Sequence, residues 1–298
     1  MKNNILILTS DTESINYQII KQSIFFFKKK NKNNYIFIGS KEKFSKQVGD
    51  MSFLNFINID YINEKDYLKK SFDKAFKILS VNKAQGLINL PLNKKKFLGN
   101  DFPGITEFIS KTFNTSGKET MLLYNEEFSV SPITTHIKLK EVSNSINQKK
   151  ILNNINNINN FYKKIIGIKK PKIALLGLNP HCGIDFFKKT EEEEIIKPAI
   201  KKIRKKNLNV IGPISADTAF FNVKNKKINS IIGLYHDQVL PTFKFAHNFN
   251  AINITLGIPF LRISPDHGTA IDLIGSNKVD PGSFLYALNF FEKYHQKI

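Results

Sequence analysis

Three histidines in this sequence each follow closely on a short apolar run that is typical of a β-strand. They are His136, His181 and His236, and the runs before them are residues 133–135, 173–178 and 231–235. One histidine in such a place is more often a hydrogen-bonded structural residue than a metal ligand. Three with the same placement indicate a site, because open α/β sheets bind ligands just beyond the carboxyl ends of their strands. Catalytic zinc sites typically take three protein ligands and leave one position for water or substrate.

Asp237 stands next to His236, and three roles are open to it. It could be a fourth contact to the metal, or it could accept a hydrogen bond from an imidazole and fix the histidine tautomer. It could also simply cap the next helix. A metal at the three histidines would act as a Lewis acid on a hydroxyl or carbonyl oxygen.

Two cations, Lys244 and Arg262, lie in apolar or turn-rich sequence, unlike the lysine runs elsewhere in the chain. An anionic ligand would explain them, since Arg offers a fork for phosphate or carboxylate and Lys a point charge. An internal salt bridge would explain either one equally well. Residues 266–270 are small enough to let a backbone approach a ligand closely. The sequence has no Gly-x-Gly-x-x-Gly after a strand and no Walker loop, so a bound nucleotide must occupy another kind of site.

The composition favours an enzyme with a small substrate over a nucleic-acid or membrane protein. The net charge is +20, but lysines lie all along the 298 residues, which is typical of solvated helix faces, and no RNP or zinc-finger motif accompanies them. The single cysteine, Cys182, cannot form an intramolecular disulfide, and residues 4–8 are strand-like instead of part of a signal peptide. Lys or Asn interrupts every apolar run, so no membrane span is expected. We expect a cytoplasmic protein.

Short β-rich runs alternate with longer amphipathic stretches, which predicts an α/β protein with a largely parallel sheet covered by helices. Strands are expected at residues 5–9, 35–39, 86–90, 120–124, 173–178 and 231–235. Helices are expected at residues 15–28, 66–81, 105–112, 146–165 and 191–206. Joints near residues 126–136 and 259–268 predict two α/β domains: residues 1–130 with 266–298, formed by both chain ends, and a middle domain of residues 131–265.

Several motifs around these residues are similar to those of the 4-hydroxythreonine-4-phosphate dehydrogenase (PdxA) family, within the isocitrate/isopropylmalate dehydrogenase-like superfamily. The matching motifs are Thr134-Thr135-His136, Gly177-Leu178-Asn179-Pro180-His181, Gly212-Pro213 with Ala216-Asp217-Thr218, Tyr235-His236-Asp237-Gln238, Asn253-Ile254-Thr255-Leu256-Gly257 and Asp266-His267-Gly268-Thr269-Ala270. They occur in family order with family-like spacing, and the resemblance covers essentially the whole chain. It implies two α/β domains with an active-site cleft between them.

The resemblance also implies a metal site and an assembly. Family members bind one divalent metal (Zn, Mg, Co or Mn) through three histidines, which His136, His181 and His236 match. They form homodimers in which both subunits contribute to each metal site, so dimer contacts are expected in the middle domain.

The implied reaction is NAD- or NADP-dependent oxidation of the C3 hydroxyl of 4-phosphooxy-L-threonine, a step of vitamin B6 biosynthesis. The product, 2-amino-3-oxo-4-phosphooxybutanoate, loses CO₂ to give 3-amino-2-oxopropyl phosphate. Substrate contacts of the family fall on Thr106, Lys244, Asn253 and Arg262. Superfamily relatives hold the adenosine part of the cofactor with a loop resembling His267-Gly268-Thr269-Ala270 through Asp272. Asp237 is a candidate general base, with a metal-bound water as the alternative.

Three segments depart from the family pattern. The usual Gly-Asp-x-x-Gly-Ile-Gly-Pro-Glu segment is replaced by Ser10-Asp11-Thr12-Glu13-Ser14-Ile15-Asn16-Tyr17-Gln18. Ile105 stands where family members have a histidine. The loop at residues 183–189, which is glycine-rich in the family, has bulky and basic residues here. The alternatives are therefore a degenerate homologue or a dehydrogenase of another phosphorylated hydroxy acid. A basic nucleic-acid-binding protein would explain the charge but not the histidines.

Overall fold

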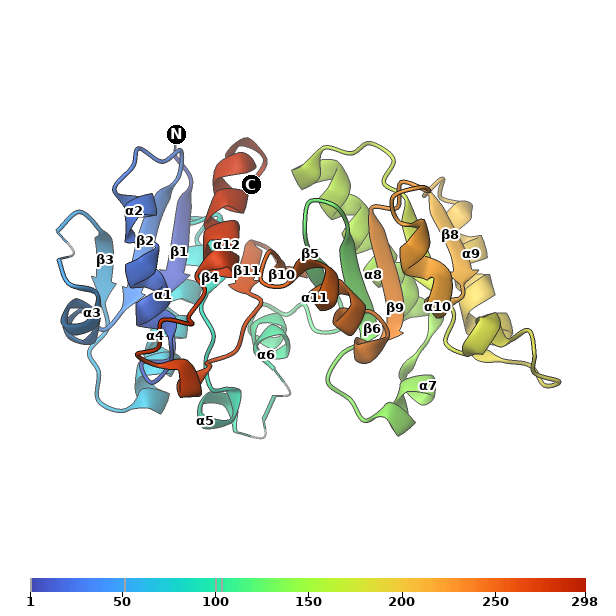
Figure 1. The fold of residues 1–298 in the computed structure, drawn as a ribbon, viewed down its shortest axis with the longest axis horizontal. Coiled ribbons are helices and arrows are strands. Elements are labelled where there is room, and N and C mark those ends of the chain that lie inside the picture. Colours follow the sequence, from blue (N-terminus) through green and yellow to red (C-terminus); the bar gives the residue numbers. More distant parts are fainter. Residues whose placement is uncertain (1, 51, 100, 103) are drawn as a thin grey trace. The chain divides into compact units, whose positions relative to one another are not determined.

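The computed structural model describes residues 2–50, 52–99, 101–102 and 104–298, which form two compact units (Figure 1). The first unit comprises Met1–Ile105, Phe249–Ile254 and Pro259–Ile298, so it contains both chain ends. The second comprises Thr106–Asn248 and Thr255–Ile258.

The first unit is built on parallel strands in the order β3-β2-β1-β4-β11. Their bounds are β1 Asn4–Leu8, β2 Asn34–Gly39, β3 Asn55–Asn58, β4 Gly86–Asn89 and β11 Leu261–Pro265. Residues 5–8 of β1 are fully buried. A continuous apolar run of this kind is expected for a parallel strand that is covered on both faces.

Helices cover the strands of the first unit, and α12 packs along β11 (Figure 1). Three helices begin at polar caps whose side chains accept a backbone N–H of the first turn: Ser40 for α3, Asn63 for α4 and Asn93 for α5. The helices are α1 Asn16–Gln22, α2 Ile24–Phe27, α3 Lys41–Val48, α4 Glu64–Ser80, α5 Lys94–Leu98 and α12 Gly282–Lys293.

The second unit has strands in the order β5-β6-β9-β7-β8. They are β5 Thr120–Tyr124, β6 Ser129–Thr134, β7 Ile173–Leu176, β8 Val210–Ile214 and β9 Ser230–Tyr235. β5 and β6 form an antiparallel hairpin, and the pairs β6/β9, β9/β7 and β7/β8 are parallel. The helices are α6 Ile105–Thr112, α7 Val142–Ser145, α8 Gln148–Phe161, α9 Lys197–Arg204, α10 Ala216–Ala219 and α11 Leu240–His247.

The compact units differ from the sequence-derived domains at residues 106–130, 249–254 and 259–265. Residues 120–124 fall in the second unit because β5 pairs with β6, and Ser131 of β6 donates to the carbonyl of Met121. β10 (Ile252–Leu256) has residues in both units.

The alternation of strands and helices confirms the predicted α/β class, but several elements differ from their expected bounds. The helix expected at residues 15–28 is divided at Ser23 into α1 and α2. The helix expected at residues 191–206 begins with a π-helical turn, Glu192–Ile196, before α9. Pro198 lies in the first turn of α9, and because it has no N–H it interrupts the helical hydrogen-bond pattern there.

Among the described residues, β3, β8, β10 and β11 were not expected from the sequence, and β6 was expected only as the short run 133–135. β8 contains Gly212-Pro213, a pair that is typical of a turn and therefore does not predict a strand. β3 has only four residues, with Asn at both ends of its apolar pair, which is too short a pattern to predict a strand. In the described part of the chain, no helix is long and apolar enough to cross a membrane.

His247 is a buried histidine at the end of α11, only 8% exposed. Its ring lies between those of Phe128 and Phe243, with centroids 5.0 and 4.7 Å away. Burial lowers the pKa of His247, since the charged imidazolium is poorly solvated there.

We therefore expect His247 to make the second unit less stable in acid. The unfolded chain binds the proton more tightly than the folded chain, so the contribution is fully present above about pH 6.5 and is lost as the pH falls below it. Urea unfolding of wild type and His247→Phe at pH 8 and pH 5 measures the effect. The difference in unfolding free energy should change with pH, and a constant difference would contradict the assignment.

Candidate active site

The three histidines of the sequence analysis lie just beyond neighbouring strands of the second unit. His136 follows β6, His236 follows β9, and His181 lies in a short turn (Pro180–Gly183) after β7. Because β6, β9 and β7 are adjacent and parallel, their carboxyl ends lie at one edge of the sheet. The rings of His136 and His236 are 5.8 Å apart between centroids.

A carboxylate accompanies two of the histidines. Asp237 Oδ1 lies 2.6 Å from His236 Nδ1, and Asp185 Oδ2 lies 2.6 Å from His181 Nδ1. The hydrogen bond and charge of Asp185 raise the pKa of His181. A carboxylate at Nδ1 orients the ring and leaves Nε2 as the available lone pair when the imidazole is neutral. Both rings are therefore oriented by a carboxylate at Nδ1, and the described residues include no group of three or more His, Cys, Asp or Glu arranged for a metal.

The loop that contains His181 is hydrogen-bonded to the carboxylate of Glu192, a residue that is completely shielded from solvent. Glu192 Oε1 accepts the backbone N–H groups of Leu178 and Asn179 at 2.7 and 2.8 Å. Glu192 Oε2 accepts the Asn179 side-chain amide at 2.9 Å. Burial raises the pKa of Glu192, but these hydrogen bonds outweigh it, so the pKa is lowered and the carboxylate stays ionised.

Glycines on either side of His181 make this tight loop possible. A Cβ on Gly177 would lie 2.9 Å from Cys182 Sγ, and one on Gly183 would lie 2.6 Å from Thr190 Oγ1. His181 itself has a left-handed backbone, with φ of +49°. This conformation is uncommon outside glycine, and the next residue, Cys182, shares it with φ of +59°.

Gln238 connects the loops of two histidines. Its Oε1 accepts the backbone N–H of Leu234 in β9, and its Nε2 donates to the carbonyl of Gly177 at the end of β7, both at 2.7 Å. In the sequence, Gln238 belongs to the motif Tyr235-His236-Asp237-Gln238 but carries no assigned role, and Glu192 is not among the expected site residues. Glu192 is one of four consecutive glutamates shortly after His181. Such a run is typical of the solvated first turn of a helix, so it did not indicate a buried carboxylate.

The expected substrate residues are divided between the two units. Arg262 in β11 is 4% exposed, and its Nε donates to Asn89 Oδ1 at 2.6 Å. Asn253 in β10 has a buried Oδ1 with no hydrogen-bond partner among the residues the structure describes. In the second unit, Lys244 is an exposed residue of α11, and Thr106 Oγ1 lies 3.5 Å from Thr255 Oγ1.

The expected cofactor residues follow β11 in the first unit. His267 Nδ1 is 3.0 Å from the carbonyl of Gly268, and a Cβ on Gly268 would meet only open space. The Thr269 carbonyl accepts the backbone N–H of Ile15 at 3.2 Å. Ala270 has a left-handed backbone and precedes a turn, Ile271–Leu273, that contains the exposed Asp272.

Two departures from the family pattern have a visible structural outcome. Ser10, at the first glycine of the usual segment, keeps a positive φ of +57°. Asn16, at a later glycine, is fully buried and donates through Nδ2 to the carbonyls of Thr9 and Pro91. Ile105 is buried at the start of α6.

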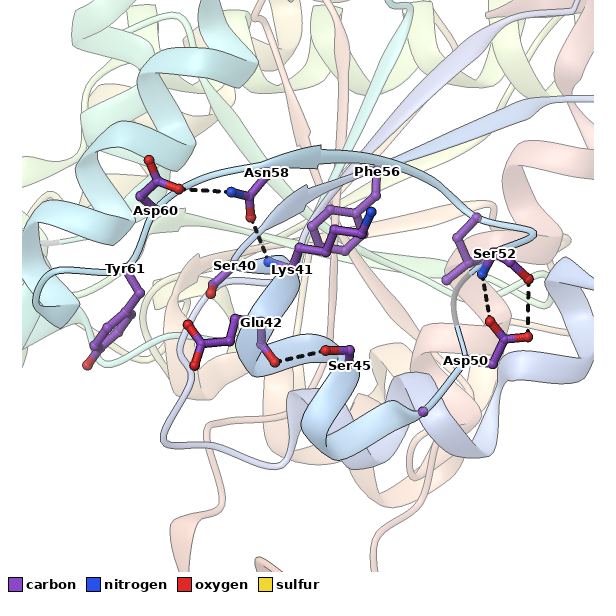
Figure 2. A pocket seen from close by; sticks show the side chains of 12 residues that line it. Ser40, Lys41, Glu42, Ser45, Asp50, Ser52, Phe56, Asn58, Asp60 and Tyr61 are labelled. Atoms are coloured by element: carbon purple, nitrogen blue, oxygen red, sulfur yellow. Dashed lines mark hydrogen bonds between the residues drawn. The ribbon is translucent and has the colours of Figure 1, made fainter.

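A separate surface hollow of about 850 Å³ lies beside α3 and β3 in the first unit (Figure 2). Its polar groups bond mainly to one another: Asn58 accepts the N–H of Lys41 and donates to Asp60, and Ser52 donates to Asp50. None of the expected site residues lines it.

Comparisons with known proteins agree with the motifs. The family described as "Pyridoxal phosphate biosynthetic protein PdxA" matches residues 7–291. A 4-hydroxythreonine-4-phosphate dehydrogenase of Sulfurihydrogenibium sp. (strain YO3AOP1) is 35% identical over 311 residues, covering 95% of both chains. The crystal structure of 4-hydroxythreonine-4-phosphate dehydrogenase from Klebsiella pneumoniae matches 99% of this chain and 100% of that one, with 25% identity and a TM-score of 0.82.

The fold extends to a wider group of enzymes. Isocitrate dehydrogenase from Methylococcus capsulatus matches 98% of this chain and 85% of its own, with 10% identity and a TM-score of 0.55. At that identity the likeness concerns the fold alone, and it confirms the expected isocitrate dehydrogenase-like fold.

Replacing Glu192 should destabilise the second unit and release the His181 loop. Glu192→Ala leaves the backbone N–H groups of Leu178 and Asn179 without their partner, while the Asn179 side-chain amide keeps its hydrogen bond to Glu191, and the loss should cost roughly 2 to 3 kcal/mol of unfolding free energy. Urea unfolding measures it, with Glu193→Ala, an exposed neighbour, as the matched control. Equal stability of the two variants would show that Glu192 does not hold the loop.

Proposed function

The chain belongs to the PdxA family, and from this membership we propose that it is a 4-hydroxythreonine-4-phosphate dehydrogenase in pyridoxal phosphate biosynthesis. When bound, NAD or NADP would accept the hydride from C3 of the substrate, while the hydroxyl loses its proton. The 2-amino-3-oxo-4-phosphooxybutanoate so formed releases CO₂ and takes up a proton to give 3-amino-2-oxopropyl phosphate. The observation that carries the proposal is the placement of three motif histidines beyond adjacent parallel strands.

The chemistry of the donor set fits a divalent metal such as Zn, Mg, Co or Mn. His136, His181 and His236 would hold it, and carboxylates at Nδ1 of His181 and His236 already orient two of the rings. A bound divalent metal supplies Lewis acidity, which lowers the pKa of a substrate hydroxyl and polarises the ketone before decarboxylation.

We propose that the metal site is shared between two copies of the chain in a homodimer. His136 and His236 lie close together, whereas no third ligand joins them among the described residues of one chain. Apolar side chains beside the histidine loops are strongly exposed, including Leu139 at 72% and Phe187 at 109%. Exposed apolar groups of this size are expected where a partner subunit packs.

Two residues of the first unit are suited to a small anionic substrate. Asn89 holds Nε of Arg262, which orients a buried guanidinium for phosphate or carboxylate. The buried Asn253 Oδ1 is an acceptor suited to a substrate hydroxyl or ammonium group. In the second unit we assign Lys244 and Thr106 to substrate binding, with Lys244 as a point charge for an anionic group.

Asp237 is the proposed general base. Its Oδ1 is engaged with His236 Nδ1, while Oδ2 has no hydrogen-bond partner in the described part of the chain. An aspartate so placed can take a proton from a hydroxyl presented at the histidines. We assign cofactor binding to His267, Gly268, Thr269, Ala270 and Asp272, where Gly268 leaves open space for a close ligand.

One observation favours a second candidate, a dehydrogenase for a related phosphorylated hydroxy acid. Ile105 takes the place of a family histidine and is buried at 5% exposure. A buried isoleucine cannot hydrogen-bond a substrate, so a polar group recognised there in relatives would lose its partner.

The test of the main proposal is NADH formation from 4-phosphooxy-L-threonine by metal-loaded protein. Chelation of the metal, or His236→Ala, should lower the rate by about a hundredfold or more, since Lewis-acid stabilisation is worth several kcal/mol. His295→Ala, near the carboxyl terminus, is the control and should keep wild-type activity. Absence of turnover in folded, metal-loaded wild type would refute the assignment.

Subunit mixing tests the shared metal site. His181→Ala and His236→Ala should each be inactive and metal-poor as homodimers. If these two ligands come from different copies, each mixed dimer contains one complete site and one that lacks both. Random pairing then restores about a quarter of wild-type activity and bound metal. Refolding the variants together should give this recovery, whereas mixing without subunit exchange should not. No recovery after verified exchange would place both histidines on one copy.

A further inference from the structure

The segment after β11, residues 266–280, is tied to the rest of the first unit mainly by polar contacts. The backbone N–H of Asp266 donates to Ser283 Oγ at 2.8 Å, and Thr269 accepts from Ile15. Val279, near the end of the segment, is buried at 5%, but before it Ile271 and Ile274 are 49% and 52% exposed. The position of residues 267–276 therefore depends on hydrogen bonds more than on apolar burial.

The side chain of Gln18 makes a two-point contact with the far end of this segment. Gln18 Nε2 donates to the carbonyl of Ser276 at 2.6 Å, and Gln18 Oε1 accepts the backbone N–H of Gly275 at 3.1 Å. Gln18 lies on α1, one turn after Ile15. Two residues at the start of α1 therefore contact the segment. Ile15 binds the carbonyl of Thr269, and Gln18 binds the backbone N–H of Gly275.

In this chain the contact uses both ends of an amide, at the position where the family segment has Glu. One end of the Gln18 side chain faces a backbone donor and the other faces a backbone acceptor, and a primary amide satisfies both at once. An ionised glutamate could accept from Gly275 but could not donate to Ser276, and it would place a carboxylate oxygen against a carbonyl oxygen.

Gln18 contacts the segment at Gly275, where the backbone turns. Gly275 has a positive φ of +77°, where the chain reverses after the turn at residues 271–273. Backbone hydrogen bonds within the segment, such as the Ser276 N–H to the Leu273 carbonyl at 2.9 Å, shape the turn, and the Gln18 amide ties the turn to α1.

We propose that Gln18 is a positioning residue for dinucleotide binding. It fixes the loop from His267 to Asp272 by holding its carboxyl-terminal end, without itself touching the cofactor. The inference rests on the proposed function, in which this loop binds the adenosine part of NAD or NADP.

The test compares Gln18→Met with Gln22→Met in the full-length, metal-loaded protein. Gln22 is an exposed residue of the same helix and serves as the matched control. We expect Gln18→Met to raise KM for NAD and the Kd for NADH, measured by fluorescence titration, about tenfold, because two neutral hydrogen bonds are lost. kcat and KM for 4-phosphooxy-L-threonine should stay within about twofold of wild type, and Gln22→Met should change none of these.

Hydrogen exchange of residues 267–277 provides a readout that does not depend on turnover. Exchange at Gly275 should accelerate in Gln18→Met and not in Gln22→Met. Gln18→Leu, which also removes both hydrogen bonds, should weaken dinucleotide binding as much as Gln18→Met, and it replaces the methionine variant in the test if that variant does not fold.

The results separate this inference from the proposed function. Faster exchange with unchanged KM for NAD and unchanged Kd for NADH would overturn the positioning role and leave the function intact. Equal increases in KM for NAD and for the phosphorylated substrate would also overturn it. If wild type itself binds no dinucleotide, the proposed function fails first, and the positioning role fails with it.

Discussion

Parallel pairing of β6, β9 and β7 is the constraint on which the rest of the candidate site depends. Parallel strands that are hydrogen-bonded neighbours end on the same side of a sheet, so residues that follow them meet although they are far apart in sequence. His136 and His236 are 100 positions apart in number, and their ring centroids are 5.8 Å apart. The buried apolar strands supply this pairing, and the polar residues at their ends supply the chemistry.

Polar side chains beyond the strands then fix loops that apolar packing cannot hold. Glu192 anchors the turn before His181, and Gln238 connects that turn to the end of β9. Asn89 accepts a hydrogen bond from the guanidinium of Arg262, and Gln18 donates one to the segment after Ala270. Buried carboxylates and amides are stable in such places only when their hydrogen bonds are satisfied, so each also restricts its loop to one conformation.

Much of the fold could be predicted because apolar runs and helical periodicity are local properties. The strands at residues 5–9 and 231–235 and helix α4 lie close to their expected positions. The strands that were missed carry locally contradictory signals, such as Gly212-Pro213 inside β8, which pairs with β7 despite a register shift. Ser23 divided an expected helix, and nothing in the apolar spacing of residues 15–28 indicated that division.

The sequence by itself determined the class of fold, the three histidines and the family, because motif residues and strand patterns are readable from residue types and spacing. It could not show which side chains brace the site. Glu192 resembles its exposed neighbours Glu193 and Glu194 in sequence, and only the tertiary structure buries it beneath the backbone N–H groups of Leu178 and Asn179. Likewise, Gln18 meets Gly275 and Ser276 across more than 250 positions. Hydrogen bonds between distant segments depend on where the chain brings them together, and that is decided by packing of the whole unit.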